Sequence, residues 1–420
     1  MSERSANVWY DEQLVGILRE KSRELYFTYS EDWLSHEDSF PVSVSLPLGE
    51  QEAYAHPFFS GLLPEADRRV KLCRKKRIDV RDDAGLLFAI GEDCAGALSI
   101  MPETSSEAHE PPSPLTQSEI TKLASTKGEL AVDESKRRFS LAGAQEKQSV
   151  IYDHDEDSYA LPNRHYPSTH ILKFETHPLV CFAEIAASQL AASIGLPVVN
   201  TKFLEGGGKY PLPFLRIDRY DRIKKDDKVL RLHQEDLLQA LGEPTALKYQ
   251  SDGGPGLAKI AELLRTHSSE PGKSILQLRD WQLLNYLIGN WDGHTKNLAL
   301  LYKPGNAAPQ LSPCYDIVAV EYLNVAKKAG WGRRMALRIG NAEVSDQVKL
   351  TDWHQFAHDL SIPPKTTMER LAQLTEILPD AATKTVNNFT TQHGTKPVYD
   401  HFPRYITKRC KRVKQQLSRK

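Results

Sequence analysis

Apolar residues recur at every second position along much of the first half of the chain, and at helical spacing along most of the second half. Alternation of apolar and polar residues predicts strands with one buried face. From this pattern we expect strands at residues 7–10, 14–18, 24–28, 42–46, 148–152, 170–174, 198–203, 213–217 and 298–302. A period near 3.6 predicts amphipathic helices, which we expect at residues 57–72, 183–194, 235–241, 256–265, 275–288, 353–360 and 365–378. The predicted fold class is α+β.

Two changes along the chain indicate domain boundaries. Residues 102–114 contain four prolines together with Ser, Glu and Thr, a composition that is typical of a linker. After Arg222 the strand pattern gives way to helices. The predicted organisation is a β-rich subdomain at 1–101, the linker at 102–114, a second β-rich part at 115–222 and a helical part at 223–420.

Composition excludes several classes of protein. Of the 420 residues, 40% are hydrophobic and 26% are charged, as in ordinary globular proteins, and the net charge of −1 argues against a histone-like protein. The sequence contains no run of 18 apolar residues, so we expect no membrane span, and residues 1–5 carry no apolar signal segment. The five cysteines are scattered without a Cys-x-x-Cys pair, which indicates buried thiols in a reducing cytoplasm.

The most informative segment is the octet Asn290–Asn297, Asn-Trp-Asp-Gly-His-Thr-Lys-Asn, which follows an apolar helical run. Its Asp292 and Asn297 stand five positions apart, and Asp316 follows after a short predicted strand. Phosphoryl transfer needs this order of parts: a carboxylate that accepts the proton of the substrate hydroxyl, an amide oxygen that binds a metal, and a later carboxylate that holds Mg²⁺ on the phosphates. The His-Arg that precedes this aspartate in protein kinases is absent, and Ile317-Val318 replaces the Phe-Gly after Asp316. The sequence therefore predicts a divergent kinase, with a small lobe at 115–222 and a large lobe at 223–420.

A kinase also needs groups for the nucleotide upstream of the octet. Lys173 ends an alternating apolar strand and is the candidate for the lysine that reaches the α- and β-phosphates. Glu184, eleven residues later in a predicted helix, is the candidate partner that orients this lysine. The small residues of Ser140–Lys147 would let backbone N–H groups approach phosphates. Since the segment matches neither a Walker A loop nor Gly-x-Gly-x-x-Gly, a plain turn is the alternative.

Several of these segments together resemble the HipA family of toxin kinases, the effectors of HipBA-type toxin–antitoxin systems. The resemblance is carried by Ser-Leu-Ala-Gly-Ala-Gln-Glu-Lys at 140–147, Asp-Gly-His-Thr-Lys-Asn at 292–297 and Pro-Cys-Tyr-Asp at 313–316. Further matches lie at 43–48, 61–64, 218–222, 233–236 and 251–256. Together they cover essentially the whole chain. The resemblance implies a bilobal protein-kinase-like fold with an additional N-terminal β-rich subdomain.

The resemblance also implies a role for individual residues. Asp292 would be the catalytic base, Asn297 and Asp316 the Mg²⁺ ligands, and Lys173 a contact of the ATP phosphates. The other residues expected at the nucleotide are Ala142, Gly143, Ala144, Gln145, Glu146 and Lys147 in a loop over the triphosphate, Asp218, Arg219 and Tyr220 at the adenine hinge, and His294, Thr295, Lys296 and Tyr315. For His294 a structural hydrogen bond is the alternative. Ser140 matches the serine that the family autophosphorylates, and a phosphate there would be repelled by the ATP phosphates.

By the same resemblance, the protein would be a serine/threonine-protein kinase toxin that phosphorylates a serine of an aminoacyl-tRNA synthetase. Glutamyl-tRNA synthetase is the expected target, while tryptophanyl-tRNA synthetase or another protein stays open. Inhibited translation would favour growth arrest and persistence. The expected partners are a helix-turn-helix antitoxin similar to HipB and, through that complex, operator DNA in the nucleoid.

The C-terminal helix expected from the spacing of Ile406, Cys410, Val413 and Leu417 is strongly basic on its remaining face. The candidates for contact with DNA phosphates are Lys408, Arg409, Lys411 and Arg412. A docked helix with a solvated basic face is the alternative. Two other functions stay open. One is a lipid or small-molecule kinase, because Asp-x-His-x-x-Asn also resembles the phosphoinositide-kinase loop; the other is a catalytically silent co-repressor that only binds antitoxin and DNA.

Overall fold

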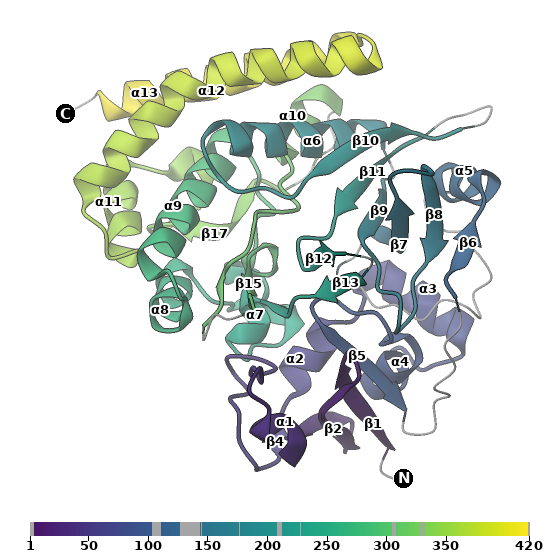
Figure 1. Cartoon of the computed structure of the whole chain (residues 1–420). Helices are drawn as coiled ribbons and strands as arrows, with labels where there is room; N and C mark the ends of the chain where they lie inside the picture. The colour runs from purple at the N-terminus through teal and green to yellow at the C-terminus, as the bar shows by residue number, and fades with distance from the viewer. Residues whose placement is uncertain are drawn as a thin grey trace. The chain divides into compact units, whose positions relative to one another are not determined.

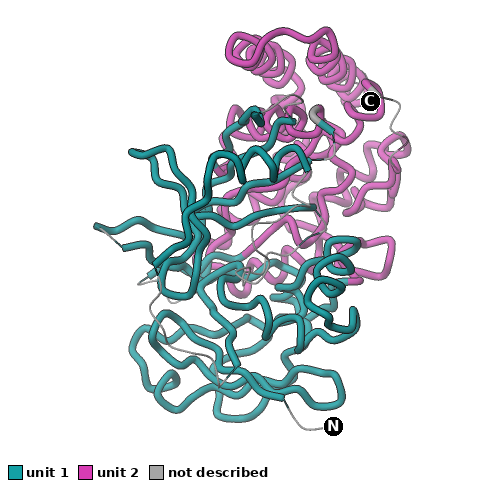
Figure 2. The backbone as a smooth tube through the Cα atoms, turned by 90° about the vertical axis from the view of Figure 1, so that its right-hand side faces the viewer, with its two compact units in different colours: residues 1–178, 200–245, 300–309 teal, residues 179–199, 246–299, 310–420 magenta. Residues whose placement is uncertain are grey.

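The computed structural model describes residues 4–102, 111–126, 143, 145–175, 177–207, 212–226, 228–304, 308–327, 330 and 332–418. They form two compact units, of which the first comprises residues 1–178, 200–245 and 300–309, and the second residues 179–199, 246–299 and 310–420 (Figure 2). The first unit contains two large antiparallel sheets and a small two-stranded one, and the second is mainly helical (Figure 1). The predicted α+β class is confirmed. Within the described ranges, no helix has both the length and the apolar character needed to cross a membrane.

A five-stranded antiparallel sheet opens the first unit, in the order β4–β3–β2–β1–β5. Its strands are β1 (Arg4–Tyr10), β2 (Gln13–Lys21), β3 (Glu24–Tyr29), β4 (Ala53–Tyr54) and β5 (Leu98–Pro102), and the helices of this region are α1 (Glu31–Ser35), α2 (His56–Gly61), α3 (Ala66–Lys76) and α4 (Asp83–Ile90). The alternation in β3 buries Leu25, Phe27 and Tyr29. These side chains share one core with Phe58 and Phe59 of α2.

Two expectations for this region are wrong. Residues 42–46 form no strand but a turn with one isolated bridge, Ser43 to Leu46. The N–H of Val44 donates to the side chain of Glu235 at 2.9 Å. This carboxylate, which is distant in sequence, accepts the hydrogen bond that a neighbouring strand would accept in a sheet. The helix expected at 57–72 is the two helices α2 and α3. The break contains Pro64, which lacks an N–H and disfavours a helical conformation in the residue before it.

The second sheet of the unit has six strands in the order β10–β11–β9–β7–β8–β6. They are β6 (Ser113–Leu115), β7 (Glu146–Asp153), β8 (Ser158–Leu161), β9 (His170–Phe174), β10 (Thr201–Glu205) and β11 (Pro213–Asp218). Helix α5 (Gln117–Ser125) contributes Ile120 and Leu123 to a core that also contains Leu172 and Phe214. Ser113 and Pro114, which we expected in the linker, belong to β6 and pair with β8.

A buried ion cluster connects the loop before β5 with the chain that follows β11. Arg219 lies 2.6 Å from Asp221 and 3.4 Å from Asp93, and Arg222 lies 3.2 Å from Asp93. Burial alone would raise the pKa of Asp221, but the two guanidinium groups hold it well below its usual value. The unit is completed by β12 (Arg222–Lys225), β13 (Lys228–Arg231), β14 (Gln234–Asp236) and α7 (Leu237–Ala240).

A second buried cluster joins residues 43–46 to residues 233–236, two segments that the sequence singled out separately. Glu235 accepts hydrogen bonds from the Val44 N–H at 2.9 Å, from the Tyr302 hydroxyl at 2.7 Å and from the Ser43 hydroxyl. Burial nevertheless raises the pKa of Glu235 to about 7, because removal from water disfavours the charged form. This carboxyl group therefore changes its charge near neutral pH.

The second unit is built around α9 (Pro271–Ile288), which is buried along nearly all of its last fifteen residues. The other elements are α6 (Pro178–Ser193), α8 (Leu257–His267), β16 (Gln310–Leu311), α10 (Val320–Lys327), β17 (Arg334–Ile339), β18 (Ala342–Val344), α11 (Leu350–Asp359), α12 (Pro364–His393) and α13 (His401–Leu417). Strand β15 (Ala299–Leu301) begins in this unit and ends in the first. The last two helices lie side by side (Figure 1). Helix α12 continues beyond the predicted end at residue 378, because its buried face runs on through Ala382, Val386 and Phe389 after Pro379.

We expect Glu235→Gln to change the pH dependence of stability. A carboxyl group whose pKa rises from 4.5 to about 7 on folding binds its proton more tightly in the folded state, so the free energy of unfolding falls as the pH rises through this window. Glutamine keeps an acceptor for Val44 and Tyr302 and a donor for Ser43, but does not titrate.

Chemical denaturation of both proteins at pH 4.5 and pH 7 measures this difference. Between these values the variant should gain about 3 kcal/mol of unfolding free energy relative to the wild type. Other titrating groups cancel in the comparison. The same pH dependence in both proteins would contradict a buried, protonatable Glu235.

Candidate functional site

The octet begins where α9 ends. Gly289 caps this helix with a φ of 72°, in the left-handed region, and its N–H donates to the carbonyl of Asn285. A Cβ at Gly289 would lie 2.6 Å from Cβ of Glu321 and even closer to the hydroxyl of Tyr405, so a larger residue has no room. The N–H of Asn290 also donates to the Asn285 carbonyl, at 2.8 Å. The chain therefore leaves α9 in one defined conformation.

Asp292 is exposed between two buried neighbours, Trp291 and Gly293. Its Oδ1 accepts a hydrogen bond from the hydroxyl of Tyr249 at 2.8 Å. The ring of Tyr249 also meets the ring of His294 edge-on, with centroids 5.3 Å apart. The loop thus presents an exposed carboxylate whose orientation is set by a neighbouring tyrosine, which suits a proton acceptor.

Asn297 and Asp316 come together although 19 residues separate them. A short 3₁₀ turn, Thr295–Asn297, is closed by the His294 N–H, which donates to Oδ1 of Asn297 at 2.9 Å. Nδ2 of Asn297 donates to Oδ2 of Asp316 at 3.4 Å. Asp316 has a φ of 55°, which is uncommon for a residue other than glycine. The pair offers amide and carboxylate oxygens, the ligand type that Mg²⁺ prefers.

Two further contacts fix the segment that carries Asp316. The hydroxyl of Tyr315 donates to the carbonyl of Lys296 at 2.7 Å. Cys314 is buried, and its backbone bonds at 2.8 and 3.0 Å to Pro197 and Val199. Lys296, Asn297, Tyr315 and Asp316, four of the residues predicted at the nucleotide or metal, therefore form one connected group.

The C-terminal helix supports this loop through a contact that the sequence did not reveal. The guanidinium of Arg409 lies 4.4 Å from the ring centroid of Tyr286 and 4.8 Å from that of Trp291. Its Nε donates to the Tyr286 carbonyl at 2.7 Å. The indole N–H of Trp291 in turn donates to Glu321 at 3.2 Å. Arg409, a candidate for DNA contact, thus packs against the residue next to Asp292.

In the first unit, β7 and β9 bring the expected phosphate-contacting residues together. The two strands pair with Lys147 opposite Lys173. Lys173 is only 1% exposed, and its Nζ lies 3.7 Å from Oε1 of Glu175. Nε2 of Gln145 donates to the same oxygen at 3.0 Å. One end of the sheet therefore holds two lysines and a carboxylate that orients one of them.

The predicted loop over the triphosphate is described only in part. Gly143 has a φ of 101° and pairs with Pro64 in an isolated bridge. Glu146 opens β7 opposite Phe174. Ser140, Ala142 and Ala144 lie outside the described residues.

The residues predicted at the adenine hinge differ in what their side chains contact. Asp218 accepts a hydrogen bond from Asn200 at 2.9 Å and lies 3.2 Å from His170. Burial would raise the pKa of Asp218, but these two neighbours lower it. The guanidinium of Arg219 is taken up by the buried ion cluster, and the hydroxyl of Tyr220 donates to Gln234. A contact of Arg219 with a nucleotide would therefore have to come from its backbone.

Two of the remaining predictions concern buried side chains in the second unit. Glu184 lies in α6 and is 3% exposed, and Thr295 is fully buried. The predicted pairing of Glu184 with Lys173 stays a prediction.

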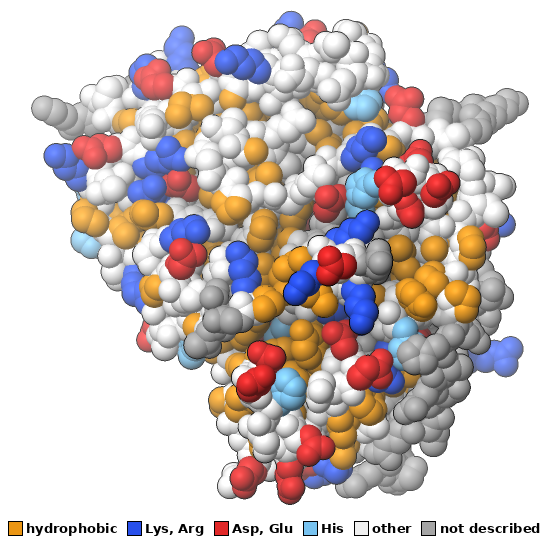
Figure 3. All heavy atoms as spheres, in the orientation of Figure 1, with side chains coloured by type: hydrophobic (Ala, Val, Ile, Leu, Met, Phe, Trp, Pro, Cys, Tyr) orange, Lys and Arg blue, Asp and Glu red, His pale blue; other side chains and the backbone are white. Residues whose placement is uncertain are grey.

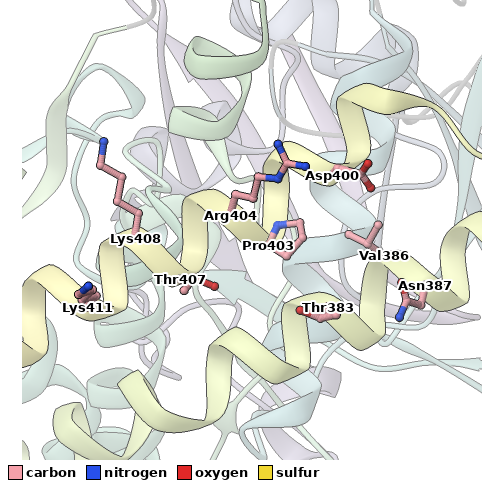
Figure 4. A pocket seen from close by; sticks show the side chains of 9 residues that line it. All are labelled: Thr383, Val386, Asn387, Asp400, Pro403, Arg404, Thr407, Lys408 and Lys411. Carbon is pink, nitrogen blue, oxygen red and sulfur yellow. The ribbon is translucent and has the colours of Figure 1, made fainter.

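Basic residues of α13 differ in what their side chains contact. Arg404, Lys408 and Lys411 line a groove of about 620 Å³ between α12 and α13 (Figure 4), and they form no ion pair with any residue that the structure describes. Arg412 instead lies 2.6 Å from Asp346. On the face drawn in Figure 3, acidic, basic and hydrophobic side chains are interspersed. Of the four candidates for DNA contact, Lys408 and Lys411 are thus the ones that line this groove.

Two family models match this chain. Residues 6–101 match the family model described as HipA N-terminal domain, and residues 139–382 match the one described as HipA-like C-terminal domain. A Sinorhizobium fredii protein named "Putative kinase Y4mE" is 32% identical over 99% of this chain and 100% of its own. A Shewanella oneidensis protein named "Serine/threonine-protein kinase toxin HipA" is 26% identical over 85% of this chain and 83% of its own.

Among solved structures, the chain is similar to a chain of the Shewanella oneidensis complex of HipA, HipB and operator DNA. The TM-score is 0.81 with 23% identity, and 97% of each chain is covered. The predicted kinase-like fold with an additional N-terminal β-rich subdomain is confirmed by this similarity.

We expect Arg409→Met to lower stability more than Arg412→Gln. The first change removes two ring contacts and a hydrogen bond from a charged donor, together worth about 2 kcal/mol. The second removes an exposed ion pair worth about 0–1 kcal/mol. Chemical denaturation measures both losses, and equal losses would mean that Arg409 does not support the Trp291 loop.

Proposed function

The chain belongs to the HipA family and is a kinase, and from that premise we propose that it is a serine/threonine-protein kinase toxin that transfers the γ-phosphoryl group of ATP to a serine of a translation enzyme. The observation that carries the proposal is the contact between Asn297 and Asp316 in the same loop region as the exposed Asp292. Fold similarity alone would leave the activity open, because one fold can host several functions. A base and two oxygen ligands in kinase order support this one.

Asp292 would act as the base. As the serine oxygen bonds to the γ-phosphorus, the bond from that phosphorus to the β–γ bridging oxygen breaks, and ADP leaves with its electron pair. The serine proton passes to the carboxylate of Asp292. Tyr249 holds one oxygen of this carboxylate at 2.8 Å, which leaves the other to face the substrate.

Asn297 and Asp316 would hold Mg²⁺. Their oxygens fit an ion that is usually bound by one or two carboxylates together with substrate phosphates. When bound, Mg²⁺ would offset the charge that develops on the phosphates. The 3.4 Å hydrogen bond from Asn297 keeps the Asp316 carboxylate in place, and the left-handed backbone of Asp316 is a conformation that clusters at functional sites.

Lys173 and the residues from Gly143 to Lys147 would bind the ATP phosphates. Lys173 is buried beside Glu175, so its ammonium group stays oriented, and Glu184 is proposed as a second partner. Asp218 and Tyr220, with the backbone of Arg219, are proposed at the adenine. We further propose, on the family resemblance, that autophosphorylation of Ser140 inactivates the enzyme, since the added charge would repel the triphosphate.

Glutamyl-tRNA synthetase is the proposed target, again on the family resemblance. The proposed partner is a helix-turn-helix antitoxin, with operator DNA bound through the complex. The similar Shewanella oneidensis structure is a complex of HipA with HipB and operator DNA, which supports this proposal by similarity of fold. Lys408 and Lys411, with Arg404, are proposed to contact DNA phosphates from the groove between α12 and α13.

The kinase proposal is tested by Asp292→Asn. Removal of the base should lower the rate of phosphate transfer from labelled ATP to lysate proteins by about 10²–10⁴-fold. Asp346→Asn is the matched control, because Asp346 is also an exposed aspartate but pairs with Arg412. Undiminished labelling by Asp292→Asn would contradict the assigned base, and no labelling by any protein would favour the silent co-repressor.

The DNA proposal is tested by Lys408→Gln combined with Lys411→Gln. If both lysines contact phosphates, the logarithm of the operator affinity of the toxin–antitoxin complex should fall less steeply with the logarithm of the salt concentration. The slope should decrease by about one unit per lysine. Fluorescence anisotropy at several salt concentrations gives this slope. Arg412→Gln, which breaks the pair with Asp346, should leave it unchanged. An unchanged slope in the double variant would exclude the groove as a DNA contact.

A further inference from the structure

The N-terminal domain contacts Gly143 and the start of β7, which belong to the described part of the proposed phosphate loop. Pro64 and Gly143 form an isolated parallel bridge, and the N–H of Glu65 donates to the Gly143 carbonyl at 3.2 Å. Both sides of this contact belong to the first unit. A segment at the start of α3 thus meets a segment that the chain reaches almost eighty residues later.

Two basic side chains of α3 extend this contact along the loop. Arg68 is a buried cation, 8% exposed, and its Nη2 donates to the carbonyl of Lys147 at 3.4 Å. Lys71, one turn further on, lies 3.6 Å from Glu146. Ala66, which precedes both, has a φ of 48°, a left-handed conformation that costs energy in a residue other than glycine. The start of α3 is therefore held in an unfavourable conformation at the point where it meets the loop.

The same loop segment is anchored on its other side by β9. Lys147 pairs with Lys173 in the sheet, and Gln145 donates to Glu175, the carboxylate that also orients Lys173. A Cβ on Gly143 would lie 3.1 Å from Nζ of Lys147, so the backbone and this ammonium group are already close. The described residues of the segment are thus contacted both from the start of α3 and from β9 with the adjoining Glu175.

We propose that the N-terminal domain positions the phosphate loop, with Arg68 as the positioning residue. The inference rests on the proposed function, in which residues 143–147 lie over the ATP phosphates. Backbone N–H groups bind phosphate well only when they are held in place beforehand, because otherwise binding must order them. Arg68 supplies that order from outside the site, through the Lys147 carbonyl.

The test compares the affinities for ATP and adenosine in Arg68→Met. Adenosine lacks phosphates, so it reports on the base site but not on the loop. Isothermal titration calorimetry should show ATP binding about tenfold more weakly than in the wild type, as expected for loss of one hydrogen bond from a charged donor. Adenosine affinity should stay the same. Any partly unfolded fraction would lower the apparent affinities for ATP and adenosine equally and leave the ratio of the two affinities unchanged.

Arg69→Met is the matched control. Arg69 is the next residue of α3, but it donates to the Val80 carbonyl at 2.8 Å and pairs with Asp83, both inside the N-terminal domain. It should leave the ratio of ATP to adenosine affinity as in the wild type. Arg68→Lys, which keeps a charged donor, should recover part of the ATP affinity and also serves if the methionine variant does not fold.

Three outcomes separate the hypotheses. If the ratio of ATP affinity to adenosine affinity is unchanged in Arg68→Met, or in both Arg68 variants, the positioning role is overturned while the kinase proposal stays intact. The same loss of ATP affinity in Arg69→Met would also overturn it, since the effect would then come from the domain as a whole. A wild-type protein that does not bind ATP would contradict the proposed function itself.

Discussion

The end of α9 at Gly289 is the constraint on which the proposed catalytic loop depends. Helix α9 is the buried centre of its unit, and the chain can leave it only through a left-handed residue without a Cβ, because Glu321 and Tyr405 occupy that space. Beyond Gly289 most side chains of the octet are buried, Trp291 and Thr295 among them, while Asp292 faces solvent. A catalytic carboxylate must be accessible to its substrate and held in position. Here the buried neighbours of Asp292 hold the loop in position.

The loop is also supported from a distant part of the sequence. Arg409 packs its guanidinium on Tyr286 and Trp291, so the C-terminal helix helps to hold the residue next to Asp292. In the first unit, Arg68 donates a hydrogen bond to the carbonyl of Lys147 at the start of β7. Arg409 donates to a backbone carbonyl of α9 next to the loop, and Arg68 donates to a backbone carbonyl of the proposed phosphate loop. Both arginines thus come from elements that are remote in sequence from the segments they contact.

The sequence signal for the proposed site is local. The spacing of Asp292, Asn297 and Asp316 is a property of neighbouring positions, and the structure brings the last two within 3.4 Å. Periodicity found most helices and strands for the same reason. It could not assign partners: the helical pattern marked Arg409 and Lys408 as equivalent, although one contacts two aromatic rings and the other lines a groove. Nor could it show that Glu235, almost two hundred residues away, bonds the turn at 42–46.

The proposed magnesium site at Asn297 and Asp316 can be tested directly by ATP binding. Isothermal titration calorimetry of ATP, with Mg²⁺ and then with a chelator, measures how much the metal adds to nucleotide affinity. In the wild type, Mg²⁺ should strengthen ATP binding, because the Asp316 carboxylate is proposed to hold the metal on the phosphates. In Asp316→Asn that gain should largely disappear while metal-free binding stays the same. A full Mg²⁺ effect in the variant would contradict the central claim.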